Sequence, residues 1–316
     1  MWEMDPVTVV SGCGTGCFCP IPKGIMMNWF DKLKSGIRTF VRRGMPENLW
    51  VKCERCHQTL YQKQMKQDYG ICPNCGAHFR INYREYLDHL LDKDTFEEVA
   101  SEVKSGDPLQ FEDRKKYSDR IKESRKATGM DAAVCTCIGT IEGKPVGIGI
   151  HEPGFIMGTL SSAEGERICR LIDRCMEDRR PLILICRSGG ARMQESALSL
   201  MQLAKINGRL AKFAKAGLLF ISILTDPTTA GVSASYALIG DINIAEPNAL
   251  IGFTGERITG SSVGEEELAA LRLAQRAEKV LENGFVDLVV PRSQMRRELS
   301  RLITLLWEAP VTGTQG

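Results

Sequence analysis

The sequence has little of what marks several common classes of protein. Its 316 residues carry a formal net charge of +2, so overall charge predicts neither nucleic-acid nor membrane binding. No run of about eighteen apolar residues occurs, which excludes an ordinary membrane-spanning helix. An apolar signal-peptide core and an Arg-rich transit pattern are both missing. The chain has only 4 histidines, and no Ser/His/Asp or Cys/His set stands out as a nucleophilic centre.

Cysteine, by contrast, is abundant, with twelve in the chain. A secreted disulfide framework is not expected at this length, and four of the cysteines are better explained by a metal site. Others lie in apolar runs, where cysteine behaves as a small buried hydrophobe: Cys135, Cys137, Cys169, Cys175 and Cys186. The apolar content of 43% supports a folded core of one large domain or two ordinary ones. A reducing compartment fits this pattern.

The four metal candidates form two C-x₂-C pairs, Cys53 with Cys56 and Cys72 with Cys75. Two such turns supply the tetrahedron of soft ligands that zinc prefers, and four cysteines close its coordination sphere. The pattern predicts a zinc ribbon with a structural metal ion, with residues 58–61 and 77–81 as strands of a hairpin. His57 and His78 are adjacent but exceed the four ligands required, so we leave them out.

Lys and Arg outnumber Asp and Glu around the two cysteine pairs, between Lys52 and Tyr86. A basic zinc ribbon could contact nucleic acid or the phosphates of coenzyme A, and a nucleic-acid-binding module is therefore one function class left open. A solvated basic face is the plainer interpretation of the same excess.

The most informative stretch is Arg187 to Glu195, which contains Gly189 and Gly190. Residues 182–186 before it form an apolar block of the length of a buried strand, and residues 191–216 after it show apolar positions at helical spacing. Glycines between a strand and a helix would present backbone N–H groups to an anion or an oxyanion. The alternative is a tight turn that needs glycine only for its dihedral angles.

Strand–turn–helix units recur along the second half of the chain. Residues 132–150 read as a hairpin, and Ser161-x-x-Glu164 is a capping box that opens a helix to about Asp178. Further strands are expected at 218–224 and 242–245, with Ala230-Gly231 following the first of them, and a helix is expected at 271–281. Such regularity predicts an α/β fold with parallel strands, in which the two glycine-containing turns emerge at the same edge.

These patterns divide the chain into six segments. We expect residues 1–26, with Cys13, Cys17 and Cys19, to be a non-native or disordered extension; whether the chain starts at Met1, Met26 or Met27 stays open. The remaining segments are an N-terminal segment at 27–48, the zinc ribbon at 49–82, a helical and polar connector at 83–131, the main domain at 132–308 and a tail at 309–316.

The combination of these motifs resembles the beta subunit of bacterial and plastid acetyl-CoA carboxylase carboxyltransferase. The resemblance rests on the cysteine ribbon and on four further stretches: 106–109 with 116–120, 188–195, 226–229 and 284–287. It spans roughly residues 27–306. It implies a ClpP/crotonase-like spiral of β-β-α units behind the ribbon.

The resemblance also implies the reaction and the partners. The reaction is transfer of CO₂ from carboxybiotin to acetyl-CoA, giving malonyl-CoA for fatty acid biosynthesis in the cytoplasm or plastid stroma. The implied partners are a carboxyltransferase alpha subunit in an α₂β₂ assembly, the biotin carboxyl carrier protein and the ATP-binding biotin carboxylase. Gly189 and Gly190 match the backbone oxyanion positions that hold the thioester oxygen, while Arg192 and Glu195 are expected to support the turn.

Some residues depart from the family pattern. Ala230-Gly231 stands where two glycines are usual, residues 158–162 lack the glycine-rich form, and Glu256-Arg257 replaces Pro-Arg before a divergent stretch at 259–268. A hydratase or thioesterase of the crotonase type is the second rival; it would need an acidic base near the glycines, for which Glu195 is the candidate.

Overall fold

The computed structural model describes residues 49–253 and 264–307. The expectations for residues 1–26, 27–48 and 309–316, and for Cys13, Cys17 and Cys19, fall outside these ranges. Among the described residues, no helix is both long and apolar enough to cross a membrane.

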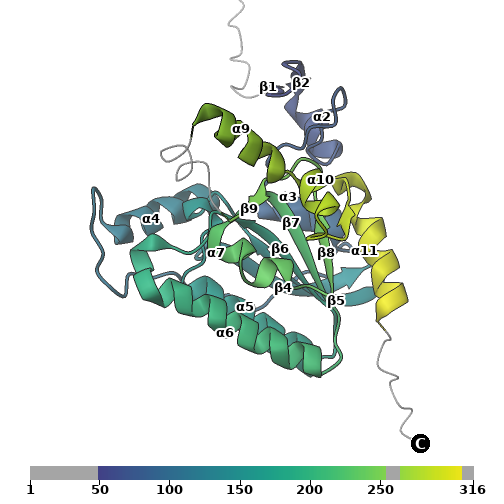
Figure 1. Cartoon of the computed structure of the whole chain (residues 1–316). Helices are drawn as coiled ribbons and strands as arrows, with labels where there is room; N and C mark the ends of the chain where they lie inside the picture. The colour runs from purple at the N-terminus through teal and green to yellow at the C-terminus, as the bar shows by residue number, and fades with distance from the viewer. Residues whose placement is uncertain (1–48, 254–263, 308–316) are drawn as a thin grey trace, which may run out of the picture. The chain divides into compact units, whose positions relative to one another are not determined.

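A mixed sheet forms the centre of the chain, with strand order β10-β8-β7-β6-β5-β4-β3 (Figure 1). Its strands are β3 (Glu97–Glu98), β4 (Val134–Ile141), β5 (Lys144–His151), β6 (Leu182–Ser188), β7 (Phe220–Thr229), β8 (Ile242–Ala245) and β10 (Leu288–Val289). The strands β5, β6, β7, β8 and β10 pair in parallel, while β3, β4 and β5 pair antiparallel. The predicted hairpin and parallel α/β arrangement are therefore confirmed.

A second, short set of strand pairings follows the carboxyl ends of the parallel strands. The register of β6 against β7 shifts between Cys186 and Ser188, after which Ser188 pairs with Thr228. Thr228 also pairs with Ile251 of β9 (Ile251–Gly252), and Leu160 forms a parallel bridge with Ala191. Each unit thus contributes a long strand, a short strand and then a helix, which is the predicted β-β-α pattern.

Helices cover both faces of the sheet, because alternate strand residues point to opposite sides. On one face lie α5 (Ser162–Glu177) and, beside it, α6 (Ser196–Lys215), around Ile168, Leu184 and Phe213 (Figure 1). The other face is covered by α3 (Tyr83–Leu90), α4 (Tyr117–Thr128) and α11 (Arg292–Leu306). Residues of the polar connector therefore belong to the core of the main domain.

Two helix predictions need correction. The helix expected at 191–216 begins only at Ser196, because residues 193–195 form a separate 3-10 turn, η2. The helix expected at 271–281 is two helices, α9 (Glu265–Ala274) and α10 (Ala277–Glu282), separated at Gln275 and Arg276. Arg276 is extended, and the backbone N–H of Ile251 donates to the carbonyl of Gln275, so strand pairing interrupts the helix there.

The apolar residues whose spacing predicted α6 do not form the buried side of this helix. The residues that predicted this helix are all exposed: Ala197, Leu200, Met201, Ala204 and Ala211. The buried positions are Ser199, Ile206, Leu210 and Phe213. The helix therefore has apolar residues on two sides, and only one of them packs against the domain.

The ribbon is built from two cysteine turns with a short helix between them. Strand β1 (Trp50–Lys52) pairs with β2 (Thr59–Tyr61), and α2 (Gln62–Gln67) follows directly. The prediction that residues 58–61 pair with 77–81 was wrong, because β2 takes the unpredicted β1 as its partner. Around the second cysteine pair, Ile71 forms a bridge with His78.

A buried ion pair joins the main domain to the ribbon. Arg292 donates to both carboxylate oxygens of Glu246 at 2.7 Å, and it also donates to the Tyr69 and Phe79 carbonyls of the ribbon. Glu246 accepts from the Tyr86 hydroxyl as well, and its Oε2 lies 3.3 Å from His78 Nδ1. Burial alone raises the pKa of the Glu246 carboxyl, but Arg292 and His78 outweigh burial and hold that pKa below its ordinary value.

Removal of the Glu246 charge should weaken this junction in a pH-dependent way. Glu246→Gln leaves Arg292 buried without its counter-charge. The free energy of unfolding, measured in urea at pH 7, should therefore be roughly 3 kcal/mol lower in the variant than in the parent. Because the pKa of Glu246 is lowered in the folded state, its carboxylate stabilises the fold at pH values above the ordinary glutamate pKa of about 4.3. This contribution is lost as the pH falls through the folded-state pKa. The difference between parent and variant should therefore shrink below about pH 4.

Glu298→Gln is the matched control, because Glu298 pairs with Arg301 on the exposed side of α11. It should change stability by less than about 1 kcal/mol. Equal losses in the two variants, or a Glu246→Gln effect that is independent of pH, would contradict the assignment.

Candidate active site and metal centre

The four predicted cysteine ligands converge on one point. Their sulfur atoms lie within 4.8 Å of one another, with Cys53 Sγ 3.6 Å from Cys75 Sγ and Cys56 Sγ 3.7 Å from Cys72 Sγ. A tetrahedron with Zn–S bonds of about 2.3 Å separates its sulfurs by about 3.8 Å, so the geometry fits zinc. The two histidines left out of the prediction are not in this cluster.

The surroundings of Cys56 favour the thiolate form that binds metal, whereas at Cys75 the Ala77 backbone lowers the thiol pKa but burial and the three other cysteines outweigh it and raise that pKa to about 12. The side chain of Asn74 and the backbone N–H of Gln58 donate to Cys56 Sγ, and these bonds lower the pKa of that thiol to about 6. The sulfurs also pack against Leu60 and Met65 in a small core of the ribbon. Four protein ligands leave no open position, so a zinc ion here is structural.

The two-glycine turn lies at the carboxyl edge of the parallel strands, as predicted. A Cβ added at Gly190 would lie 2.6 Å from Cβ of Ala230 and 3.3 Å from the backbone nitrogen of Gly231, so the two predicted turns meet. Gly190 has φ of +108°, a region that favours glycine, whereas Gly189 has no such restriction. The nearest atoms to a Cβ at Gly189 would all belong to Met157, with the flexible end of the side chain, Cε, at 3.0 Å and the Cβ and carbonyl oxygen at 3.7 Å.

Both glycine N–H groups have partners within the chain. The N–H of Gly189 donates to the carbonyl of Met157 at 3.0 Å, and that of Gly190 donates to the hydroxyl of Ser188 at 3.0 Å. Since α6 begins only at Ser196, the turn does not lie at the N-terminus of that helix, and the helix dipole does not act directly on it. Any anion at this turn is held by individual N–H groups.

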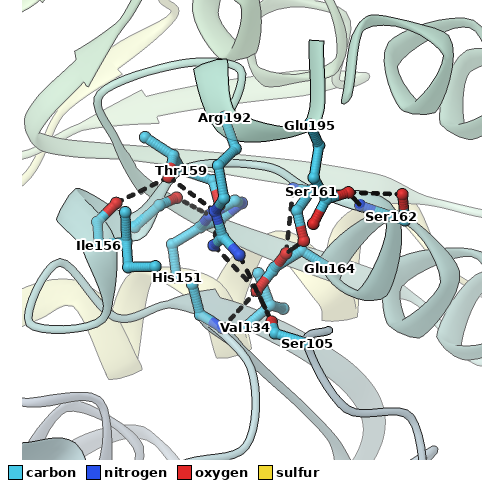
Figure 2. Close-up of polar contacts among 12 residues, drawn as sticks. Ser105, Val134, His151, Ile156, Thr159, Ser161, Ser162, Glu164, Arg192 and Glu195 are labelled. Carbon is cyan, nitrogen blue, oxygen red and sulfur yellow. Dashed lines mark hydrogen bonds and ion pairs between the residues drawn. The ribbon is translucent and has the colours of Figure 1, made fainter. Parts of the chain in front are cut away.

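Arg192 is the centre of the support beneath the turn. Its guanidinium is fully buried and donates to the Glu164 carboxylate at 3.0 Å and to the Thr159 carbonyl at 2.6 Å (Figure 2). It also donates to the Tyr117 hydroxyl at 3.1 Å. Its backbone N–H donates to the carbonyl of Leu160, whose own N–H donates to the carbonyl of Gly190. Arg192 therefore fixes the backbone that holds Gly190.

The two buried carboxylates near the turn are fully engaged. Glu164 accepts from the backbone N–H of Ala133 and from the backbone and hydroxyl of Ser161, which confirms the predicted capping box. Burial alone raises the pKa of the Glu164 carboxyl, but Arg192 and these donors outweigh burial and keep that pKa below its ordinary value. One oxygen of Glu195 accepts from the backbone N–H of Ser162 at 2.8 Å and from the hydroxyl of Ser162 at 2.5 Å (Figure 2). The other oxygen accepts from the Tyr117 hydroxyl at 2.8 Å.

His151 lies near the same turn but is also committed. Its Nδ1 is 2.8 Å from the Gly158 carbonyl, which can only accept, so Nδ1 carries the proton and Nε2 accepts from the Tyr236 hydroxyl at 2.8 Å. Burial lowers the pKa of His151 to about 4, so the ring is neutral at pH 7. Neither His151 nor Glu195 has an atom available as a general base.

Several residues of this network were not identified from the sequence. Ser105, Tyr117 and Thr159 contact Arg192 from distant segments, and Met157 covers Gly189. Glu164 carried a local signal through the capping box, and Tyr117 lies in the family stretch 116–120, although that stretch did not indicate its contact with Arg192. The others are placed by tertiary contacts that no spacing rule reveals.

Comparison with known proteins defines the class of this site. The carboxyl transferase domain model matches residues 82–309, and the acetyl-CoA carboxylase zinc finger model matches residues 50–75. Among solved structures, a Pseudomonas malonate decarboxylase hetero-tetramer has a TM-score of 0.58 at 19% identity, covering 74% of this chain and 85% of that one. The transcarboxylase 12S structure has a TM-score of 0.58 at 23% identity, covering 76% and 42%. Fold and family model together define a crotonase-like carboxyl transferase with a zinc ribbon.

Relatives of known name narrow the assignment. The acetyl-coenzyme A carboxylase carboxyl transferase subunit beta of Pelobacter propionicus is 45% identical over 283 residues, which is 89% of this chain and 99% of that protein. The protein of the same name from Synechococcus elongatus is 43% identical, covering 89% of this chain and 92% of that one. The chain belongs to the carboxyl transferase family and, within it, to these beta subunits.

Loss of one sulfur ligand should release the metal. Because binding of structural zinc contributes folding free energy, Cys72→Ser should lose its zinc and unfold the ribbon, while the sheet of the main domain keeps its structure. Metal analysis should find one zinc ion per parent chain, and circular dichroism should report the sheet.

Cys169→Ser serves as the control, because Cys169 is equally buried but lies on α5, away from the ribbon. It should retain the parental zinc content. A Cys72→Ser protein with full zinc, or a parent without zinc, would refute the metal site.

Proposed function

We propose that this chain moves a carboxyl group from carboxybiotin, held on a carrier protein, to acetyl-CoA, forming malonyl-CoA. The observation that carries this proposal is a two-glycine turn, supported by a buried ion pair, where His151, Glu164 and Glu195, the titratable residues described beside it, are buried and already hydrogen-bonded. The beta-subunit relatives share this domain and the ribbon over most of their length. None of the cysteines that the structure describes forms a disulfide, which supports a reducing compartment such as the cytoplasm.

Backbone donors suit this reaction. Carboxybiotin that releases CO₂ leaves negative charge on its ureido oxygen, and this anion can take a proton from the acetyl methyl group. The resulting enolate carries charge on the thioester oxygen and attacks CO₂. We assign the N–H groups of Gly189 and Gly190 to that oxygen, and one such donor is typically worth about 3–4 kcal/mol.

Substrate binding must then exchange two hydrogen bonds. Gly189 would turn its N–H from the Met157 carbonyl to the thioester oxygen, and Gly190 would turn from the Ser188 hydroxyl. The Met157 side chain is 53% exposed and Ser188 is buried, so Met157 faces the approaching substrate. We infer that the loop around Met157 shifts when acetyl-CoA binds.

The rival hydratase or thioesterase loses its candidate base. Glu195 is 1% exposed, and both of its oxygens accept hydrogen bonds from Tyr117 and Ser162. Abstraction of a proton from substrate or water by the protein would require a carboxylate that reaches the site. Proton transfer to biotin, without a protein base, is consistent with this arrangement.

The second oxyanion hole is assigned to a partner alpha subunit, because this chain offers one two-glycine turn for two developing charges.

The exposed apolar side of α6 is a suitable contact surface for that subunit. It includes Leu200 at 57% and Met201 at 63% exposure, and Met193, which is 83% exposed, lies in the chain between the glycine turn and this helix. An apolar strip beside an active site is typical of an interface.

The assignment predicts dependence on the partner. The chain should be close to inactive alone and should form malonyl-CoA when an alpha subunit is added to carboxylated carrier protein and acetyl-CoA. Chromatographic detection of malonyl-CoA measures this directly. Full turnover by the isolated chain, or no turnover with any alpha subunit of a related bacterium, would refute the division of the site.

A pair of variants tests the α6 surface in the same assay. Met201→Glu should leave the isolated chain within about 0.5 kcal/mol of its parental stability, since Met201 is exposed, yet prevent assembly and turnover. Lys212→Glu changes an exposed polar residue farther along α6 and should assemble normally. Assembly that is unaffected by Met201→Glu would exclude this face.

Gly189→Ala tests the oxyanion assignment better than a change at Gly190. Gly190 has positive φ and lies against Ala230, so any side chain there strains the fold. Gly189 has no such strain, and the one tight contact among the nearest atoms to an added methyl is Met157 Cε, at the end of a flexible side chain. We expect Gly189→Ala to melt within a few degrees of the parent while kcat falls on the order of a hundredfold.

The double variant Gly189→Ala/Met157→Ala removes the crowded methyl contact and serves as the control. If the methyl acts by blocking the thioester oxygen, kcat should stay low in the double variant. Recovery of full turnover would assign the loss to the contact with Met157, and a fully active Gly189→Ala would exclude Gly189 as a donor site.

A further inference from the structure

Tyr117 is a buried residue that the reaction described above does not use. It is the first residue of α4, it is completely buried, and it comes from the connector that precedes the main sheet. Its ring packs in the core that also contains Ile121 and Phe155. Nothing about its local sequence requires a hydroxyl at this position, because a phenylalanine would fill the same space.

The hydroxyl of Tyr117 joins the two charged residues that follow the glycine turn. It donates to Glu195 Oε1 at 2.8 Å and accepts from Arg192 Nη1 at 3.1 Å. Burial raises the pKa of this phenol well above its ordinary value, partly offset by Arg192, so the proton stays on the oxygen and the donor role is fixed.

Each of these contacts leads to the glycine turn. Arg192 is bonded through its backbone to Leu160, which in turn holds the Gly190 carbonyl. Glu195 joins the end of η2 to the start of α5 through Ser162. The segment between Gly190 and α6 is therefore fixed at both of its charged residues, and the same hydroxyl contacts both.

We propose that Tyr117 is a positioning residue for the Gly189-Gly190 turn, acting through Arg192 and Glu195. The inference rests on the proposed carboxyl transfer, and it assigns an active-site role to the connector. Without the hydroxyl, Arg192 Nη1 and Glu195 Oε1 each lose a partner in a buried site. The turn then samples other positions, and the N–H donors no longer point where the charge develops.

Tyr117→Phe is the test, and Tyr86→Phe is its matched control. Tyr86 is also completely buried, and its hydroxyl also donates to a buried glutamate, Glu246, at 2.8 Å beside a buried arginine. The two variants remove the same group from the same kind of contact, one beside the turn and one at the ribbon junction. Both should bind one zinc ion and lose similar thermal stability.

The two variants should differ in kinetics. In the complex with alpha subunit, Tyr117→Phe should lower kcat on the order of tenfold with little change in KM for acetyl-CoA, because misplaced donors weaken the transition state more than substrate binding. Tyr86→Phe should keep kcat within about twofold of the parent, since its contact is not part of the turn. Equal kcat losses in both variants, or full kcat in Tyr117→Phe, would overturn the proposal.

Hydrogen exchange gives a second readout that does not need the reaction. Amides at 189–192 should exchange faster in Tyr117→Phe and at the parental rate in Tyr86→Phe; equal rates in the two variants would overturn the positioning role. A parent that makes no malonyl-CoA would refute the proposed function, and this exchange comparison would still decide the role of Tyr117.

If Tyr117→Phe does not fold, Glu195→Gln is the alternative variant, because it weakens the same contact at equal volume. It should show the same pattern, and full kcat with parental exchange in Glu195→Gln would refute the proposal.

Discussion

The buried ion pair between Arg192 and Glu164 is the interaction on which the site depends. Both side chains are fully buried, and a buried charge is tolerated only when it is paired and its remaining hydrogen-bonding groups are satisfied. Thr159 and Ser105 satisfy the arginine, while Ser161 and Ala133 satisfy the glutamate. The pair thereby connects the connector, the start of α5 and the glycine turn, which lie far apart in sequence.

This support explains why a site built from backbone groups can be precise. Glycine N–H groups carry no side chain that could be held in place by packing, so their direction is set entirely by the surrounding backbone. Here that backbone is fixed by the Leu160–Ala191 bridge and by Arg192 beneath it. The charged residues of the motif thus serve the turn, and the groups proposed to contact substrate are main-chain atoms and Met157.

Much of the fold could be predicted from the sequence, for identifiable reasons. The four cysteines, the capping box at Ser161 and the alternation of strands and helices are local patterns, and the structure confirms each of them. The break between α9 and α10 depends on a long-range contact with Ile251, which local spacing does not contain, whereas β1 pairs with β2 as a local hairpin that the sequence analysis missed. The apolar spacing of α6 correctly predicted a helix but did not indicate which side is buried, because both sides are apolar. Tyr117 lies 75 residues before Arg192, so its contact could not be derived from either motif.

The most direct test of this account is a crystal structure of the complex with the alpha subunit and acetyl-CoA bound. The thioester oxygen should lie about 3 Å from the backbone nitrogens of Gly189 and Gly190, a hydrogen-bond distance. The carbonyl of Met157 should have moved away from Gly189, while Arg192 and Glu164 remain paired. A thioester oxygen held elsewhere, with Gly189 still bonded to Met157, would contradict the account.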